Sequence, residues 1–228
     1  MAIKKIIFNA DDFGYDKDVN KGIVYAHKNG VVKSTTVLTG REAFDDAVWL
    51  AKENPGLKTG LHIDLDEFVE IQRPQGTILK YKNFPPSKQQ ITDTINRQLD
   101  KFLTAGLKLS HLDSHHHTHL LPEVLPAVIE KAKELNVPMR FYGAFYTDVK
   151  FAEKMLKMVD DAGVKHPGHF INGWYWQNID EDFETAELMT HPGFKGIWRE
   201  YEMAKCCDPN LIEYLNAKGI EIISFEEL

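Results

Sequence analysis

An alternation of short apolar runs with amphipathic segments constrains this chain more than any other sequence feature. Runs typical of buried strands occur at 3–8, 35–38 and 58–63, and helical periodicity follows the first two at 17–28 and 43–53. Successive strands joined through helices lie parallel, with right-handed crossovers. The alternation therefore predicts an α/β fold on a mostly parallel sheet.

The same rhythm continues in the second half of the chain. Further helices and strands are predicted at 87–104, 108–112, 122–135, 138–142, 148–162, 168–171, 185–189, 210–218 and 220–224. Seven to eight strands in 228 residues suit a compact (β/α) barrel, formed by residues 1–228 as a single catalytic domain. A doubly wound open sheet is the alternative. Residues 66–86 are rich in proline and break the rhythm, which predicts a long loop that is either a lid or substrate wall, or an insertion without a role.

Composition limits the partners and the compartment that we expect. A formal net charge of −7 disfavours a nucleic-acid surface. No stretch approaches the roughly 20 apolar residues that span a bilayer, and the N-terminus lacks the pattern of a secretory signal. The two cysteines, Cys206 and Cys207, are adjacent and build no disulfide framework. We expect a reduced, cytoplasmic protein without nucleic-acid or membrane partners. The sequence does not distinguish a monomer from a homodimer.

A dense histidine run follows the predicted strand at 108–112. Four histidines fall within five residues in DSHHHTH at 113–119. Imidazole is the commonest metal ligand and the usual acid–base group near neutral pH. An extended run would align His115, His117 and His119, whereas a helical run would align only the first and last of these. The run predicts a metal site with one or two histidine ligands. Asp113 could orient one of these ligands through a hydrogen bond, and the roles of His116, His117 and His119 stay open.

Acidic and imidazole side chains also follow other predicted strands. Asp11 and Asp12 come after the first strand, and His62 closes the third. His191 follows the strand at 185–189. Because parallel strands end at one rim, we expect these groups to meet there. Two imidazoles and one carboxylate leave metal positions open for water and a substrate oxygen, and a second carboxylate can serve as general base. The pattern predicts a hydrolytic metal centre.

Taken together, the motifs resemble those of the YdjC-like carbohydrate deacetylases, the family that includes chitooligosaccharide deacetylase. The motifs are NADDFG at 9–14, VN-x-GI at 19–23, KSTT at 33–36, GLH at 60–62, HLDSHHHTH at 111–119 and HPG at 191–193. The resemblance covers nearly the whole chain, and NADDFG and DSHHH-x-H are its specific parts. It implies a (β/α) barrel of the polysaccharide-deacetylase type.

The resemblance also implies an activity and a set of site residues. It places the metal ligands at Asp12, His62 and His115, the base at Asp11 and the general acid at His191. The cofactor would be one divalent ion, magnesium or zinc. The reaction would be hydrolysis of an N-acetyl group from an amino sugar or a short oligosaccharide.

Substrate recognition is less firmly indicated by the sequence. The resemblance places Arg140 near the site, and Trp174 in the WYW run is a candidate for stacking on a sugar or for a hydrophobic patch. The segment at 63–67 departs from the family pattern where a substrate would be recognised. Two other classes stay open: another metallohydrolase such as a phosphoesterase, and a non-catalytic metal-dependent carbohydrate-binding protein.

Overall fold

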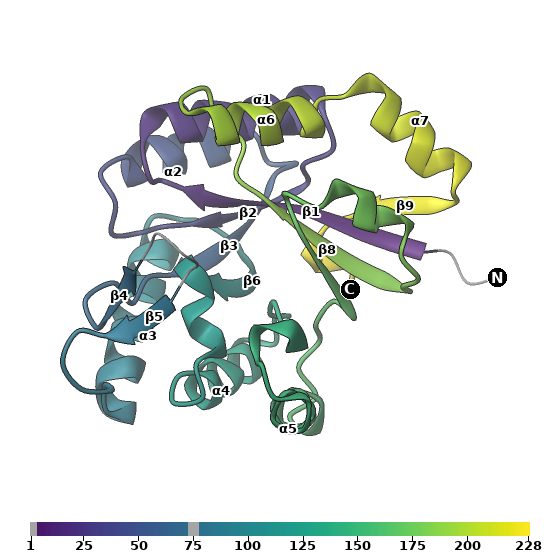
Figure 1. Cartoon of the computed structure of the whole chain (residues 1–228). Coiled ribbons are helices and arrows are strands. Elements are labelled where there is room, and N and C mark those ends of the chain that lie inside the picture. The colour runs from purple at the N-terminus through teal and green to yellow at the C-terminus, as the bar shows by residue number, and fades with distance from the viewer. Residues whose placement is uncertain (1–3, 73–77) are drawn as a thin grey trace.

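A curved, mostly parallel seven-stranded sheet organises the computed structural model, which describes residues 4–72 and 78–228 (Figure 1). Its hydrogen-bonded order is β6-β3-β2-β1-β8-β7, and β9 pairs with β1. The strands are β1 (Lys4–Phe13), β2 (Ser34–Val37), β3 (Lys58–Ile63), β6 (Leu109–Ser114), β7 (His169–Asn172), β8 (Thr185–Thr190) and β9 (Ile220–Ile223). Each pairing within this sheet is parallel, as the alternation predicts.

Helices cover both sides of this sheet and bury its apolar strands. In Figure 1, α1, α2, α6 and α7 lie above the sheet, and α3, α4 and α5 lie below it. They are α1 (Lys17–Asn29), α2 (Phe44–Glu53), α3 (Lys88–Thr104), α4 (Leu125–Leu135), α5 (Val149–Asp161), α6 (Ile197–Cys206) and α7 (Pro209–Ala217). Asp16 caps α1, and a Ser87–Gln90 capping box starts α3. No helix of the described residues is long and apolar enough to cross a membrane.

The strand β1 is the longest and central element of the sheet. Its first half, 4–7, pairs with β9, and its second half pairs with β2, while β8 runs along the other side. The register against β2 shifts between Ala10 and Phe13. Between these two residues, Asp12 has φ of +73°, in the left-handed region that non-glycine residues rarely occupy. The sequence predicts that the strand ends before Asn9, whereas the structure keeps both aspartates within it.

The sheet does not close into a hydrogen-bonded ring within the described residues. The hydrogen-bonded order of strands ends at β6 on one side and at β7 on the other. The prediction of a strand at 138–142 is wrong, because this segment contributes only a single bridge, Leu112 to Met139, among the described residues. Pro138 has no N–H to donate there, which weakens a ladder at this position. Side chains connect this segment to β7, since Tyr142 stacks on Phe170 with ring centroids 4.1 Å apart. The fold is therefore barrel-like, with one side joined by side-chain packing.

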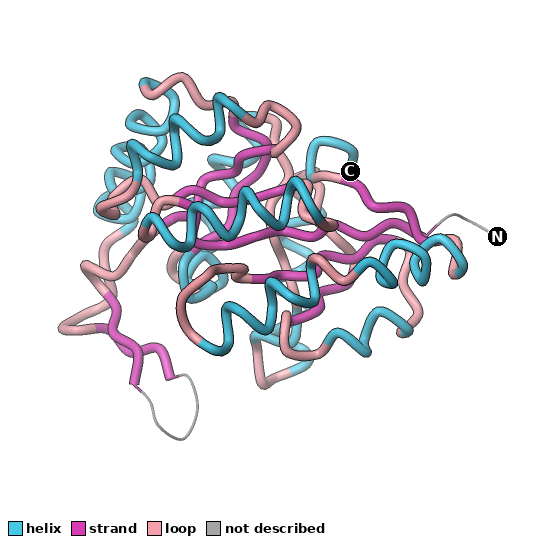
Figure 2. The backbone as a smooth tube through the Cα atoms, turned by 90° about the horizontal axis from the view of Figure 1, so that it is seen from above, coloured by secondary structure: helices cyan, strands magenta, loops and turns pink. Residues whose placement is uncertain are grey.

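Two further segments differ from the prediction. The loop predicted at 66–86 contains an antiparallel hairpin of β4 (Val69–Gln72) and β5 (Ile78–Tyr81), which projects from the sheet in Figure 2. Pro74 and Gly76, two of the residues behind the loop prediction, lie outside the described residues. The helix α6 was not predicted, because two of its four buried positions are charged residues, Arg199 and Glu202, which hide the apolar periodicity.

Candidate metal and acid–base site

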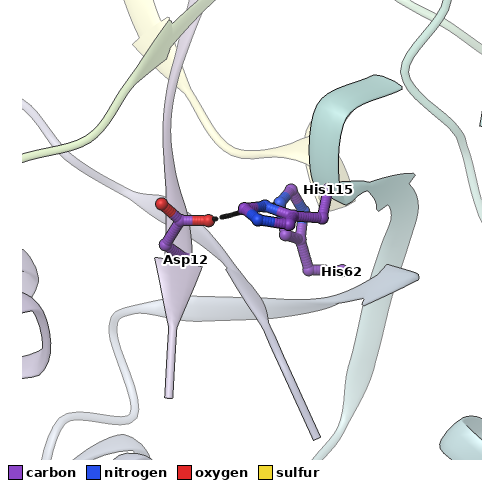
Figure 3. Close-up of side chains that lie close together, drawn as sticks. All are labelled: Asp12, His62 and His115. Carbon is purple, nitrogen blue, oxygen red and sulfur yellow. Dashed lines mark ion pairs between the residues drawn. The ribbon is translucent and has the colours of Figure 1, made fainter. Parts of the chain in front are cut away.

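Three predicted ligands converge at the carboxyl end of the sheet (Figure 3). Oδ1 of Asp12 lies 3.1 Å from Nδ1 of His115 and 3.6 Å from Nε2 of His62. One ligand atom from each residue lies within 4.8 Å of the others. The Oδ1 atom is buried without a hydrogen-bond partner among the described residues. A buried carboxylate oxygen without a donor is costly, so this donor set fits a divalent cation.

Unusual backbone conformations bring the histidine run over this site. His115 starts a short 3-10 segment, 115–120, in which His116 and His117 have φ of +57° and +58°. Such conformations cost about 1–3 kcal/mol each and persist where the surroundings impose them. The turn packs the rings of His115 and His116 with centroids 3.7 Å apart. The run is therefore neither extended nor α-helical, and only His115 among its members joins the group with Asp12.

A second carboxylate orients His62. Nδ1 of His62 lies 2.6 Å from Oδ1 of Asp113, whose other oxygen accepts a 3.1 Å hydrogen bond from Thr36. Burial opposes a charged imidazole, but Asp113 together with Asp11 and Asp12 outweighs it and raises the pKa of His62 to about 9. Asp113 holds the Nδ1 proton, and a metal at Nε2, which faces Asp12, would replace the second proton of the ring. This is the usual arrangement of a metal-binding histidine supported by a carboxylate.

Asp11 lies beside the metal group and is held from below by Arg140. Its two oxygens accept hydrogen bonds of 2.7 and 2.8 Å from the guanidinium, and Asn9 donates a third at 2.9 Å. Burial raises the pKa of Asp11, yet Arg140 and neighbouring imidazoles outweigh it and hold that pKa well below its usual range. Oδ2 lies 3.9 Å from Nε2 of His62 and 4.0 Å from Nε2 of His191. Asp11 is thus an ionised acceptor between the two imidazoles.

Arg140 is fully buried beneath the site. Besides Asp11, it contacts Asp113 at 3.0 Å and Glu187 at 2.6 Å. Burial raises the pKa of Glu187 to about 7 despite this cation. Because Arg140 has no exposed surface, it reaches carboxylates rather than the pocket. The structure therefore favours a role for Arg140 in positioning Asp11 over the predicted contact with substrate.

His191 stands opposite the metal group and is held by α6. Glu202 accepts from its main-chain N–H at 2.5 Å and lies 3.3 Å from its Nδ1. Burial lowers the pKa of His191, but the hydrogen bond and charge of Glu202 outweigh it, and the net shift is upward. The edge of the His191 ring meets Trp198, with centroids 5.4 Å apart. Nε2 consequently faces Asp11, with its proton favoured.

These groups line one open pocket of about 740 Å³. Trp174 borders it, is 53% exposed and stacks on Tyr201 with centroids 5.8 Å apart. Arg41 lines the other side and pairs with Asp64 and Asp66 at 2.7 and 2.5 Å. The remaining lining residues include Asp11, Asp12, Tyr15, His62, His115, His116, His117, Tyr142, Asn172, Met189, His191, Trp198 and Arg199. The pocket thus joins a polar floor to an aromatic rim.

Comparison with known proteins identifies the family of this chain. A model of YdjC-like proteins matches residues 5–217. The chain belongs to the YdjC-like protein family. Carbohydrate deacetylases of Vibrio parahaemolyticus and Brevibacillus brevis are each 34% identical, over 98% of this chain and 96% and 99% of theirs. The carbohydrate deacetylase of Clostridium beijerinckii is 31% identical, over 98% of this chain and 100% of its own.

Solved structures share the fold at lower sequence identity. A candidate cellobiose-phosphate cleavage protein of Enterococcus faecalis V583 aligns with a TM-score of 0.79 and 24% identity, over 98% of both chains. The Bc1960 peptidoglycan N-acetylglucosamine deacetylase aligns with a TM-score of 0.56 and 12% identity, over 98% of this chain and 86% of its own. These likenesses confirm the polysaccharide-deacetylase-like α/β fold expected from the sequence.

The other three histidines in the run of this YdjC-like chain, His116, His117 and His119, have separate environments. His119 is fully buried, with Nδ1 2.6 Å from the Ser114 hydroxyl and Nε2 3.0 Å from the Arg140 carbonyl. It therefore supports the segment that carries Arg140. His116 lies 4.0 Å from Asp66 at the pocket edge, and His117 lines the pocket with a buried Nδ1 that lacks a partner in the described part of the chain.

Sequence reasoning gave no site role to four side chains around the site: Asn9, Glu187, Arg199 and Glu202. A buried carboxylate in the apolar strand TAELMT is a usable signal for Glu187, because strands covered on both faces rarely retain unpaired charge. Arg199 and Glu202 are three residues apart, which places them on one helical face once α6 is known. Without that helix, their spacing carries no information.

Proposed function

We propose that this protein is a metal-dependent carbohydrate deacetylase that hydrolyses the N-acetyl group of an amino sugar or a short oligosaccharide. The observation that carries the proposal is the placement of an ionised carboxylate, Asp11, 4.0 Å from an imidazole, His191, in a pocket that also contains a metal-type donor group. Binding alone needs neither an acid nor a base. The names of the relatives support the same activity.

Asp12, His62 and His115 would hold one divalent ion. When bound, such an ion supplies a Lewis acid for the acetyl carbonyl and lowers the pKa of a bound water toward about 7. Two imidazoles and one carboxylate favour zinc, cobalt or iron-type ions over magnesium on grounds of ligand softness. Zinc is therefore our first choice for the resident ion, with magnesium as the alternative.

Asp11 would take the proton of the attacking water at Oδ2. Its depressed pKa keeps it ionised at neutral pH, and Arg140 fixes both oxygens so that one edge of the carboxylate faces His62 and His191. An ionised, oriented acceptor is the state that general-base catalysis requires. The low basicity of Asp11 is offset because an acidified water is easier to deprotonate.

His191 would give a proton from Nε2 to the departing amine. An amide nitrogen leaves poorly unless it is protonated, so the reaction requires an acid on the side opposite the base. Glu202 holds Nδ1 and favours the protonated ring. The exposed ring of Trp174, which borders the pocket and is supported by Tyr201, would stack on the sugar, because a pyranose ring presents an apolar face to aromatic rings.

A measurement of acetate release tests this proposal. The purified chain would be stripped of metal, reloaded with Zn²⁺, Co²⁺ or Mg²⁺, and given N-acetylglucosamine and its oligomers. We expect metal-dependent acetate release at about one ion per chain. Phosphorylated sugars in the same panel test the phosphoesterase alternative. Phosphate release without acetate would overturn the proposal, and sugar binding without turnover would favour a binding protein.

A further inference from the structure

The middle of α6 contacts both the predicted metal ligand Asp12 and the predicted acid His191. Glu202 holds His191, as described above, and Arg199 lies one helical turn earlier on the same face. Nη2 of Arg199 donates a 2.7 Å hydrogen bond to Oδ2 of Asp12, and Nη1 donates a 3.4 Å bond to the His191 carbonyl. The guanidinium also lies over the ring of Trp198, 4.2 Å from its centroid. One helix therefore connects the predicted metal ligand with the predicted acid.

The two oxygens of Asp12 have different surroundings. Arg199 occupies Oδ2, whereas Oδ1 is buried without a hydrogen-bond partner in the described residues and faces the two imidazoles. A carboxylate can offer a metal one or both oxygens, and a strong donor on one oxygen leaves the other as the ligand. Asp12 is only 3% exposed, so water gives little competition for this bond.

From this geometry we propose that Arg199 is a positioning residue that orients Asp12 to bind the metal through Oδ1 alone and thereby sets the metal affinity. The inference rests on the proposed function only in its metal site, not in the sugar or the reaction. The hydrogen bonds of Arg199 end on Oδ2 of Asp12, which is not the oxygen that faces the imidazoles, and on the His191 carbonyl. Its effect therefore passes through Asp12.

Neighbouring residues hold the Arg199 side chain in one position. A Cβ on Gly193 would lie 3.0 Å from Cδ of Arg199, so the HPG turn approaches the side chain as closely as a glycine allows. The Tyr15 ring lies on another side, 5.8 Å from the guanidinium carbon. A side chain enclosed in this way loses little further freedom when it orients a carboxylate, which favours a fixed partner for Asp12.

Metal binding by the full chain tests the inference directly. Zn²⁺ titration by calorimetry and the visible spectrum of the Co²⁺-loaded chain would be compared for the wild type, Arg199→Met and Arg97→Met. Loss of an outer partner of a metal ligand typically weakens binding about 10- to 100-fold, and we expect this loss with Arg199→Met, together with a changed Co²⁺ spectrum. Arg97→Met is the matched control, because it removes the same kind of side chain from a surface pair with Glu67 that lies outside the pocket. We expect its Zn²⁺ affinity to match the wild type.

A double-mutant cycle separates this role from simple support of α6. In an Asp12→Asn background, Arg199→Met should cause no further loss of affinity, because the bond through which it acts is already changed. Arg199→Lys keeps one charged donor and should restore part of the affinity, which tests the idea even if the methionine variant fails to fold. Wild-type affinity and an unchanged Co²⁺ spectrum in Arg199→Met would overturn the inference while leaving the proposed function intact. A wild-type chain that binds neither metal would overturn the inference together with the metal part of that function.

Discussion

At the scale of single residues, the site depends on two adjacent carboxylates with different partners. Asp11 has Arg140 on both oxygens, whereas Asp12 has Arg199 on one oxygen and leaves the other toward the imidazoles. The positive φ of Asp12 turns its side chain away from the regular strand alternation. Adjacent residues can therefore supply one base and one metal ligand.

Asp11→Asn should retain the metal but lose most of the deacetylase rate. The amide cannot accept the water proton, and a positioned base is worth about 10²–10⁴-fold. Zn²⁺ content and acetate release would be measured on the same preparation. Asp12→Asn is the neighbouring control and should lose metal affinity first. Turnover that stays at the wild-type level in Asp11→Asn would exclude Asp11 as the base.

Glu202→Gln should shift the basic limb of the pH–rate profile to lower pH. In the wild type, Glu202 raises the pKa of His191, so the acid keeps its proton to higher pH. Without that charge His191 deprotonates earlier as pH rises, and activity falls sooner. Thr190→Val removes a hydrogen bond to the same carboxylate but keeps its charge, and it should leave the limb nearly in place. An unmoved limb in Glu202→Gln would contradict the assignment.

At the scale of elements, Arg140 connects the segment after α4 to β1, β6 and β8. It reaches Asp11, Asp113 and Glu187 with no exposure to solvent. The segment around it has almost no ladder of its own, so this charge network and the Tyr142–Phe170 stack take over the joining role. The inward direction of the guanidinium also places Arg140 on these carboxylates rather than in the pocket.

Arg140→Met should destabilise the protein by about 3–5 kcal/mol, because it leaves buried carboxylates without their cation. Urea unfolding would measure this loss. The deficit should shrink as pH falls, since protonation removes the uncompensated charge of these carboxylates. Arg97→Met, which breaks a surface pair with Glu67, should cost no more than about 1 kcal/mol. Equal losses in the two variants would argue against the network.

At the scale of the whole molecule, the candidate ligands come from distant parts of the chain. Asp12 lies in β1, His62 in β3 and His115 after β6, so the group exists only when the sheet is assembled. A ligand that binds only the folded state stabilises it by mass action.

Zn²⁺ should therefore raise the unfolding temperature, and above its Kd the gain in stability should grow with the logarithm of the free Zn²⁺ concentration. At 100 times its Kd, the gain is about 2.7 kcal/mol. Differential scanning calorimetry with and without Zn²⁺ would measure the shift, and Asp12→Asn should abolish most of it. If the melting temperature of the wild-type chain is the same with and without saturating Zn²⁺, that result would contradict a site that forms only on folding.

The sequence by itself determined the parallel α/β plan and the residues that meet at its carboxyl rim, because both depend on local periodicity and on the rule that parallel strands end together. The positions of Asp11, Asp12, His62, His115 and His191 follow from that rule. Only the tertiary structure decided how these groups are oriented. The positive φ of Asp12 lies at a shift in the pairing of β1 with β2. The contacts of Arg140 with Asp11 and of Arg199 with Asp12 join segments more than 100 residues apart, which no local pattern encodes.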